Sequence, residues 1–167
     1  MTADELRALQ APVKAGYKES PSAAQLTLRA SGELKGEKLI CRVASGLGPI
    51  DAGLHAAAGG DGMSACSGDM LLQSLVACAG VTLQAVATAM LIPLRSGTIE
   101  AEGDLDFRGT LGVSKEVPVG FKAIRLKFRL DSDATPEQLA TLLKMTERYC
   151  VIYQTLKKPG EISATLA

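Results

Sequence analysis

Residues 59–93, GGDGMSACSGDMLLQSLVACAGVTLQAVATAMLIP, are the stretch that decides the fold. After a glycine-rich turn, Ser67 is a good helix N-cap, and Asp69 lies in the first turn, where the helix dipole favours an anion. The rest of the helix carries no charge, and Pro93 supplies the stop. The pattern predicts one long helix that is apolar nearly all round and must therefore be buried. Cys78 lies in its middle, away from either end.

This helix is also long enough to span a bilayer. Glutamine, serine and threonine side chains dilute it, however, and no cluster of Lys or Arg flanks its start. We therefore expect a buried core helix and no membrane insertion.

Composition limits the class of protein. A chain of 167 residues can bury a sizeable core, and we expect an N-terminal helix and linker over residues 1–20, then a single domain over residues 21–167. The 18 basic side chains are balanced by 18 acidic ones, and the basic residues form no run. Nucleic acid is therefore not an expected partner. The four cysteines show no close-spaced pairing, and the N-terminus lacks the pattern of a signal peptide. A cytoplasmic protein with reduced thiols is the expectation.

The segments before the long helix read as a short helix and a strand pair. Residues 3–11 predict a helix that Pro12 stops. Residues 24–34 alternate between apolar and polar side chains, which predicts a half-buried strand, and residues 37–44 return as a second strand after a glycine-bounded turn. Cys41 falls on one face of this second strand and is expected to pack there.

Residues 45–66 read as a long loop, and such a loop in a compact domain is usually functional or disordered. It contains His55, the only histidine, and the GGDG sequence of residues 59–62. GGDG lacks the lysine and the preceding strand of a phosphate-binding loop. A histidine side chain can serve as a ligand or base at neutral pH, so His55 is a candidate, although a lone histidine in a loop is more often only solvated.

Two charged strands follow the long helix. Acidic side chains alternate with apolar ones in residues 98–107, and basic side chains do the same in residues 121–131. Opposite charges across a strand ladder stabilise pairing. We predict that the two strands are antiparallel neighbours joined by residues 108–120, and that their charges form a solvated face.

The C-terminal part begins with Thr135-Pro136-Glu137-Gln138, a capping box with proline at the first helical position. This helix carries Cys150 near its end, and residues 161–166 alternate as a last strand. The order of elements predicts an α+β fold with an antiparallel sheet around the long buried helix.

This arrangement over residues 24–166 resembles the OsmC/Ohr family, the osmotically inducible and organic hydroperoxide resistance proteins. The residues that carry the resemblance are SGDMLLQSLVACAGVTL around Cys78 and RYCVIYQTL around Cys150. It implies an intertwined homodimer with the two cysteine-bearing helices at its centre. It also implies a thiol-dependent peroxidase without a cofactor, in which Cys78 attacks the peroxide and Cys150 resolves the product.

Three positions depart from the family pattern. Gly68 stands where the family usually places a glutamate of an Asn-Pro-Glu motif, so Asp69 is the candidate acid. The resemblance implies a thiolate-stabilising arginine from the N-terminal strand region, for which Arg42 is the candidate and Arg29 the reserve. Val151 replaces the proline that often follows the second cysteine.

The chemistry of this reading starts from a thiolate, because only the thiolate attacks an O–O bond. A cysteine in mid-helix gains little from its own helix dipole, so we expect its pKa to need a neighbouring cation. Attack leaves a sulfenic acid on Cys78, which a nearby thiol condenses to a disulfide. Apolar surroundings favour a small alkyl or fatty hydroperoxide as substrate, and a thiol reductant must reopen the disulfide.

Two other classes stay open. In the first, the protein is a non-enzymatic ligand-binding or structural dimer whose buried cysteines are inert packing residues. In the second, Cys66, Cys78, Cys150 and His55 hold a metal, although no CxxC or HxxxH spacing supports this. We expect no metal site.

Overall fold

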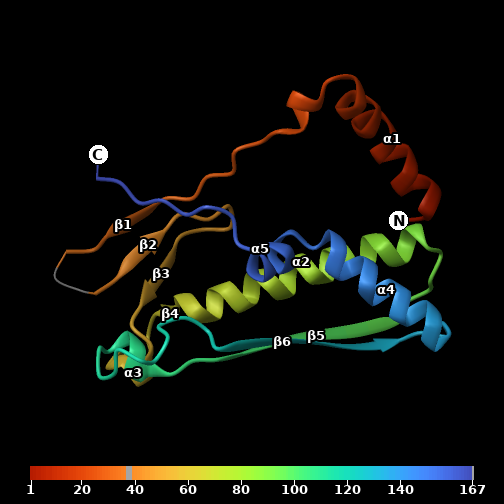
Figure 1. The fold of residues 1–167 in the computed structure, drawn as a ribbon. Coiled ribbons are helices and arrows are strands. Elements are labelled where there is room, and N and C mark those ends of the chain that lie inside the picture. The colour runs from red at the N-terminus through yellow and green to blue at the C-terminus, as the bar shows by residue number, and fades with distance from the viewer. Residues whose placement is uncertain (37–38, 167) are drawn as a thin grey trace. The chain divides into compact units, whose positions relative to one another are not determined.

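A computed structural model describes residues 1–36 and 39–166. In chain order its elements are α1 (Ala3–Glu19), the 3-10 helix η1 (Pro21–Ala24), β1 (Gly32–Leu34), β2 (Cys41–Val43), β3 (Ile50–Gly53), the 3-10 helix η2 (Ala56–Ala58), β4 (Ala65–Cys66), α2 (Ser67–Ala89), β5 (Ser96–Asp104), α3 (Phe107–Thr110), β6 (Ala123–Asp131), α4 (Pro136–Tyr149) and α5 (Val151–Lys157) (Figure 1). This mixture of helices and small, mainly antiparallel sheets around a long helix confirms the predicted α+β class.

The chain divides into two compact units. The first contains residues 1–22, residues 74–100 and the chain from residue 127 onward, and the second contains residues 23–73 and 101–126. The core of the first unit is a cluster of buried apolar residues from α2, α4 and the turn after α2, packed against apolar side chains of β5 and β6 (Leu83, Ala87, Ile92 and Leu142, with Ile99, Phe128 and Leu130). In this unit α2 and α4 therefore cover the apolar face of the strand pair.

The helix α2 confirms the long helix predicted from the sequence. By length and composition it could cross a membrane, but Leu75, Ala79, Leu83 and Ala87 recur along one stripe of the helix and are buried inside the first unit. This stripe of α2 thus belongs to the core of the first unit. Its opposite side is open in the single chain, where the side chain of Val81 is 72% exposed.

The strands β5 and β6 are antiparallel neighbours, as their charge pattern predicted. Main-chain hydrogen bonds join Arg95 N to Asp131 O at one end of the pair and Lys122 N to Asp104 O at the other, so the residues pair in reverse order. Opposite charges meet across the ladder, where the guanidinium of Arg125 donates to Asp104 at 2.8 Å and Arg129 pairs with Glu100.

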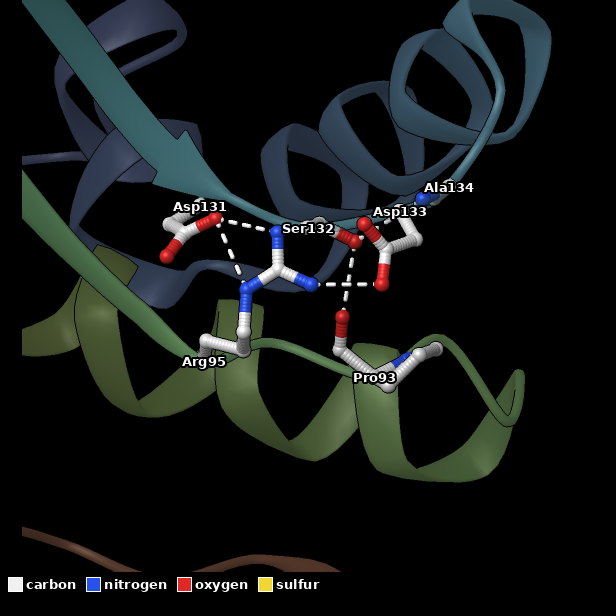
Figure 2. A network of polar contacts seen from close by, with 6 residues as sticks. All are labelled: Pro93, Arg95, Asp131, Ser132, Asp133 and Ala134. Carbon is white, nitrogen blue, oxygen red and sulfur yellow. Dashed lines mark hydrogen bonds and ion pairs between the residues drawn. The ribbon is translucent and has the colours of Figure 1, made fainter.

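A polar network fastens the segment after α2 to the end of β6 (Figure 2). The Arg95 guanidinium lies between the carboxylates of Asp131 and Asp133, and its Nε donates to Asp131 at 2.9 Å. The Ser132 hydroxyl donates to the carbonyl of Pro93 at 2.7 Å. These contacts fix the chain direction into α4, whose predicted capping box at Thr135 is present.

The second unit contains a small sheet in the order β1-β2-β3-β4. Its first three strands are antiparallel, whereas β3 and β4 run parallel. The prediction of one loop over residues 45–66 is therefore wrong in part, because β3, η2 and β4 form within it. The predicted strand 37–44 is present only as β2, and residues 37 and 38 lie outside the described residues.

Three other predictions of local structure are wrong. The helix α1 continues through Pro12 to Glu19. Only residues 32–34 of the predicted strand 24–34 are in a strand. No strand forms among the described residues of 161–166, since an alternating pattern forms a strand only where a neighbouring strand can pair with it.

Candidate functional site

Cys78 and Cys150 meet inside the first unit. Cys78 lies half-buried in the middle of α2, and Cys150, with 0% exposure, is the single residue between α4 and α5. The two thiols are free and are hydrogen-bonding partners. The structure thus brings together the two cysteines that the sequence singled out.

Cys150 turns the chain between the two helices. Its ψ of 109° is extended, so it serves both as the C-cap of α4 and as the N-cap of α5. Its sulfur accepts the main-chain N–H of Tyr153 at 3.5 Å, which satisfies one of the free donors at the start of α5. The predicted single helix through Cys150 is therefore two helices with a break at the cysteine.

The surroundings of Cys78 favour its thiolate. Burial opposes ionisation, but the N–H groups of Ile152 and Val151, together with the Cys150 thiol and the Thr82 hydroxyl, outweigh it and hold the pKa of Cys78 below the ordinary value of a thiol. These N–H groups belong to the first turn of α5, where helix N–H groups have no partner within the helix. The start of α5 thus stabilises the Cys78 thiolate, which the middle of α2 cannot do.

The pKa of the Cys150 thiol shifts in the opposite direction. Burial raises the pKa of its thiol, and a neighbouring Cys78 thiolate raises it further. Cys78 therefore loses its proton more readily than Cys150 does. A nucleophilic thiolate beside a protonated thiol is the arrangement that attack followed by disulfide formation requires.

Arg42 and Asp69, the other two predicted site residues, belong to the second unit. Arg42 of β2 holds Asp51 of β3 in a bidentate ion pair, with N–O distances of 2.6 and 2.7 Å. Asp69 is exposed in the first turn of α2. The reserve candidate, Arg29, lies in a segment that forms no strand. The roles predicted for all three residues stay predictions.

His55 and Cys66 line a separate cavity of about 350 Å³ in the second unit. The His55 Nδ1 accepts the Ala57 N–H at 3.0 Å, and its ring stacks on Phe107 with 5.0 Å between the centroids. These contacts give His55 a local structural role. Within residues 1–36 and 39–166, no three or more His, Cys, Asp or Glu side chains group as metal ligands would.

Sequence reasoning missed the main-chain donors of the site. The N–H groups of Val151 and Ile152 are available only because the chain breaks at Cys150, and the apolar periodicity continues through that residue. The one available signal was Cys150 itself, a residue that can accept a hydrogen bond three residues before Tyr153. Thr82, one turn after Cys78 on α2, could have been found from its helical spacing.

Comparisons with known proteins agree with this geometry. The sequence profile described as OsmC-like protein matches residues 59–165. No curated protein matches the chain at a significant level.

Solved structures share the fold at low sequence identity. An OsmC-like protein from Mycoplasma pneumoniae has a TM-score of 0.67 and 15% identity, with 80% of this chain and 89% of that chain covered. An organic hydroperoxide resistance protein OsmC from Legionella pneumophila has a TM-score of 0.63 and 16% identity, covering 81% and 93%. An organic hydroperoxide resistance protein from Elizabethkingia anophelis has a TM-score of 0.64 and 15% identity, covering 80% and 90%.

Proposed function

The chain belongs to the OsmC-like protein family, and on that premise we propose that it is a thiol-dependent peroxidase that reduces organic hydroperoxides. Neighbours named for organic hydroperoxide resistance support a redox or peroxidase role at the level of the family. The observation that carries the more specific proposal is the contact between two free thiols whose pKa values move in opposite directions. Two cysteines that serve only for packing would not require pKa shifts in opposite directions.

The proposed reaction follows from the opposite shifts of the two pKa values. The Cys78 thiolate attacks the terminal oxygen of the hydroperoxide, the O–O bond breaks, and the alkoxide leaves as an alcohol after taking a proton from Cys150. Cys78 is then a sulfenic acid. The Cys150 thiolate attacks this sulfur and expels hydroxide, which gives a disulfide and, with a proton from solvent, water. A thiol reductant supplies two electrons and two protons to restore both thiols.

Arg42 and Asp69 are proposed in supporting roles. Arg42 is the candidate cation for further stabilisation of the thiolate, and its bidentate pair with Asp51 supports this because a guanidinium must be fixed in place to act on one sulfur. Asp69 is the candidate acid near the start of α2. Arg42→Met and Asp69→Asn should each slow peroxide reduction if these roles hold.

A homodimer is the proposed assembly. Only 22% of the most apolar 18-residue window of α2 is buried in one chain, which leaves much of an apolar helix to be covered. Alternating apolar side chains are also exposed in the two segments that were predicted as strands but are not paired among the described residues, namely Leu26 and Leu28 in the first and Ile162 and Leu166 in the second. A second copy that pairs with these segments would cover both sets.

The substrate, reductant and location follow from the same site. Apolar residues dominate around Cys78 on α2, which favours a small apolar hydroperoxide over hydrogen peroxide. A thiol compound or protein is the proposed reductant, because it must exchange with a disulfide. The two thiols must be reduced to act, so the cytoplasm is the proposed compartment.

Two cysteine variants test the proposal because they should differ in kind. Cys78→Ser should abolish the reduction of cumene hydroperoxide. Cys150→Ser should consume about one equivalent and then stall as a sulfenic acid that excess peroxide drives to the sulfinic acid. Mass spectrometry of the wild type after peroxide and before reductant should find a Cys78–Cys150 disulfide.

Cys41→Ser and Cys66→Ser are the matched controls, since both thiols belong to the second unit and Cys78 and Cys150 to the first. Both should keep wild-type turnover. If Cys78→Ser reduces the peroxide at the wild-type rate, the peroxidase proposal fails and the non-enzymatic dimer takes its place.

A further inference from the structure

The break between α4 and α5 frees main-chain groups whose new partners can be followed one by one. In a continuous helix, the Val151 N–H would donate to the carbonyl of Glu147, four residues earlier. The extended ψ of Cys150 turns the chain and directs this N–H away from α4. The Cys150 N–H is the last to donate in the helical manner, to Thr146 O at 2.9 Å. The Glu147 carbonyl therefore loses its helical donor.

The side chain of Gln154 replaces that donor. Its Nε2 donates to the carbonyl of Glu147 at 2.7 Å, so the amide reaches from the middle of α5 back to the last turn of α4. The main-chain N–H of Gln154 donates to Cys150 O at 3.0 Å, which places the residue within the first full turn of α5. Gln154 thus bonds to both sides of the break.

We propose that Gln154 is a positioning residue for the Cys78 thiol: by occupying the Glu147 carbonyl, it holds the break open and keeps the N–H groups of Val151 and Ile152 directed at the Cys78 sulfur. The inference rests on the proposed function for its importance, because Cys78 is the proposed nucleophile. It adds a residue that contacts neither thiol and acts through the chain between them.

Without the Gln154 side chain, the break between α4 and α5 could close into a continuous helix. If the Glu147 carbonyl lost the Gln154 amide, the Val151 N–H could return to it by a rotation of ψ at Cys150 toward the helical value of about −42°. This return would give the carbonyl its helical main-chain donor again. It would also take a donor away from Cys78. Gln154 therefore acts as a competitor that occupies the carbonyl first.

The test replaces Gln154 and reads the ionisation of Cys78. Gln154→Met keeps the length of the side chain and removes the donor, and Gln154→Glu also places a carboxylate against the carbonyl. The control is Thr155→Val, which removes a hydrogen bond from the next residue to Val151 O inside α5 and leaves Glu147 untouched. The rate of Cys78 alkylation by iodoacetamide is measured against pH, and the modified peptide is quantified by mass spectrometry.

Loss of the Val151 donor, with Ile152 displaced by the same rotation at Cys150, should move the midpoint of the Cys78 profile upward by about one pH unit in Gln154→Met, because hydrogen bonds to the charged form favour ionisation. Below the midpoint, alkylation should then be about tenfold slower than in the wild type. Gln154→Glu should move the midpoint at least as far, and Thr155→Val should leave it unchanged. A merely structural role would lower the thermal midpoint of unfolding without moving the alkylation profile.

A Gln154→Met profile that superimposes on the wild-type profile in a folded protein overturns the inference. The inference is also overturned if neither Gln154→Met nor Gln154→Glu folds. The Gln154 side chain would then be required for the stability of the fold. The alkylation profile does not depend on peroxide turnover. A Cys78→Ser protein that still reduces peroxide would therefore end the proposed function and leave the test of Gln154 valid.

Discussion

At the scale of single residues, Cys78 and Cys150 differ through their neighbours. Both are free thiols in the same unit, and burial opposes the ionisation of both. Cys78 receives N–H groups from the start of α5, whereas Cys150 faces a neighbour that is becoming negative. Geometry around the sulfur, more than burial, therefore decides which thiol ionises first.

Val151→Pro tests the effect of these hydrogen bonds by removing one main-chain N–H. Proline has no N–H, and the first position of a helix tolerates it, while the extended ψ of Cys150 suits the residue before a proline. The variant should fold like the wild type but lose one donor to Cys78. Because a lost donor disfavours the thiolate, the pKa of Cys78 should rise by roughly half a pH unit to one pH unit.

The measurement is the pH dependence of Cys78 alkylation, which rises with the thiolate fraction. The wild-type midpoint should lie below that of a free cysteine, since the pKa of Cys78 is lowered, and the Val151→Pro midpoint should lie between the two. Val151→Ala keeps the N–H and serves as the control. Identical profiles for Val151→Pro and Val151→Ala would show that the donor has no effect.

The sequence could identify the two cysteines but not the groups that separate their behaviour. Cys78 was found in a long apolar helix and Cys150 near the end of an amphipathic helix, and the family resemblance implied their roles. The donors from Val151 and Ile152 depend on one dihedral angle at Cys150, and no pattern of residue types encodes that angle. The expectation that Cys78 needs a cation overlooked the start of a second helix as a source of stabilisation.

At the scale of elements, the charges of β5 and β6 have a structural role. Arg125 donates to both Glu102 and Asp104, and these ion pairs lie on the exposed face of the strands. The strand pair could be predicted because the alternation indicated two strands and the opposite charges indicated that they are neighbours. The segments 24–34 and 161–166 showed only alternation of apolar and polar residues, which does not identify a partner strand.

Reversing one of these charges should weaken the pair modestly. Asp104→Lys places two cations together in a solvent-screened position, so the midpoint of thermal unfolding should fall by roughly 1–3 °C. Glu116→Lys, a reversal in the exposed connection between α3 and β6, is the control and should leave the midpoint unchanged. Peroxide reduction should be normal in both variants. Lost activity in a folded Asp104→Lys protein would mean that the charged face is a functional site.

At the scale of the whole molecule, α2 carries more apolar surface than one chain covers. Val81 is 72% exposed on this helix, and Val113, in the connection between α3 and β6, is 71% exposed. If a second copy covers α2, Val81→Asp should convert the dimer to a monomer or unfold it, and Val113→Asp should not. Sedimentation at micromolar concentration measures the difference. A wild-type protein that sediments as a stable, folded monomer would contradict the homodimer.

The joint between α4 and α5 consists of Cys150 alone, and this has a consequence for how the chain can change in length. One added or deleted residue would turn α5 by about 100° relative to α4, because a helix has 3.6 residues per turn. The N–H groups of Val151 and Ile152 would then point away from Cys78. Insertions should be tolerated in the connection between α3 and β6 and rejected between Glu147 and Gln154. The reactivity of the thiol is thus encoded in a spacing as well as in the identities of the residues.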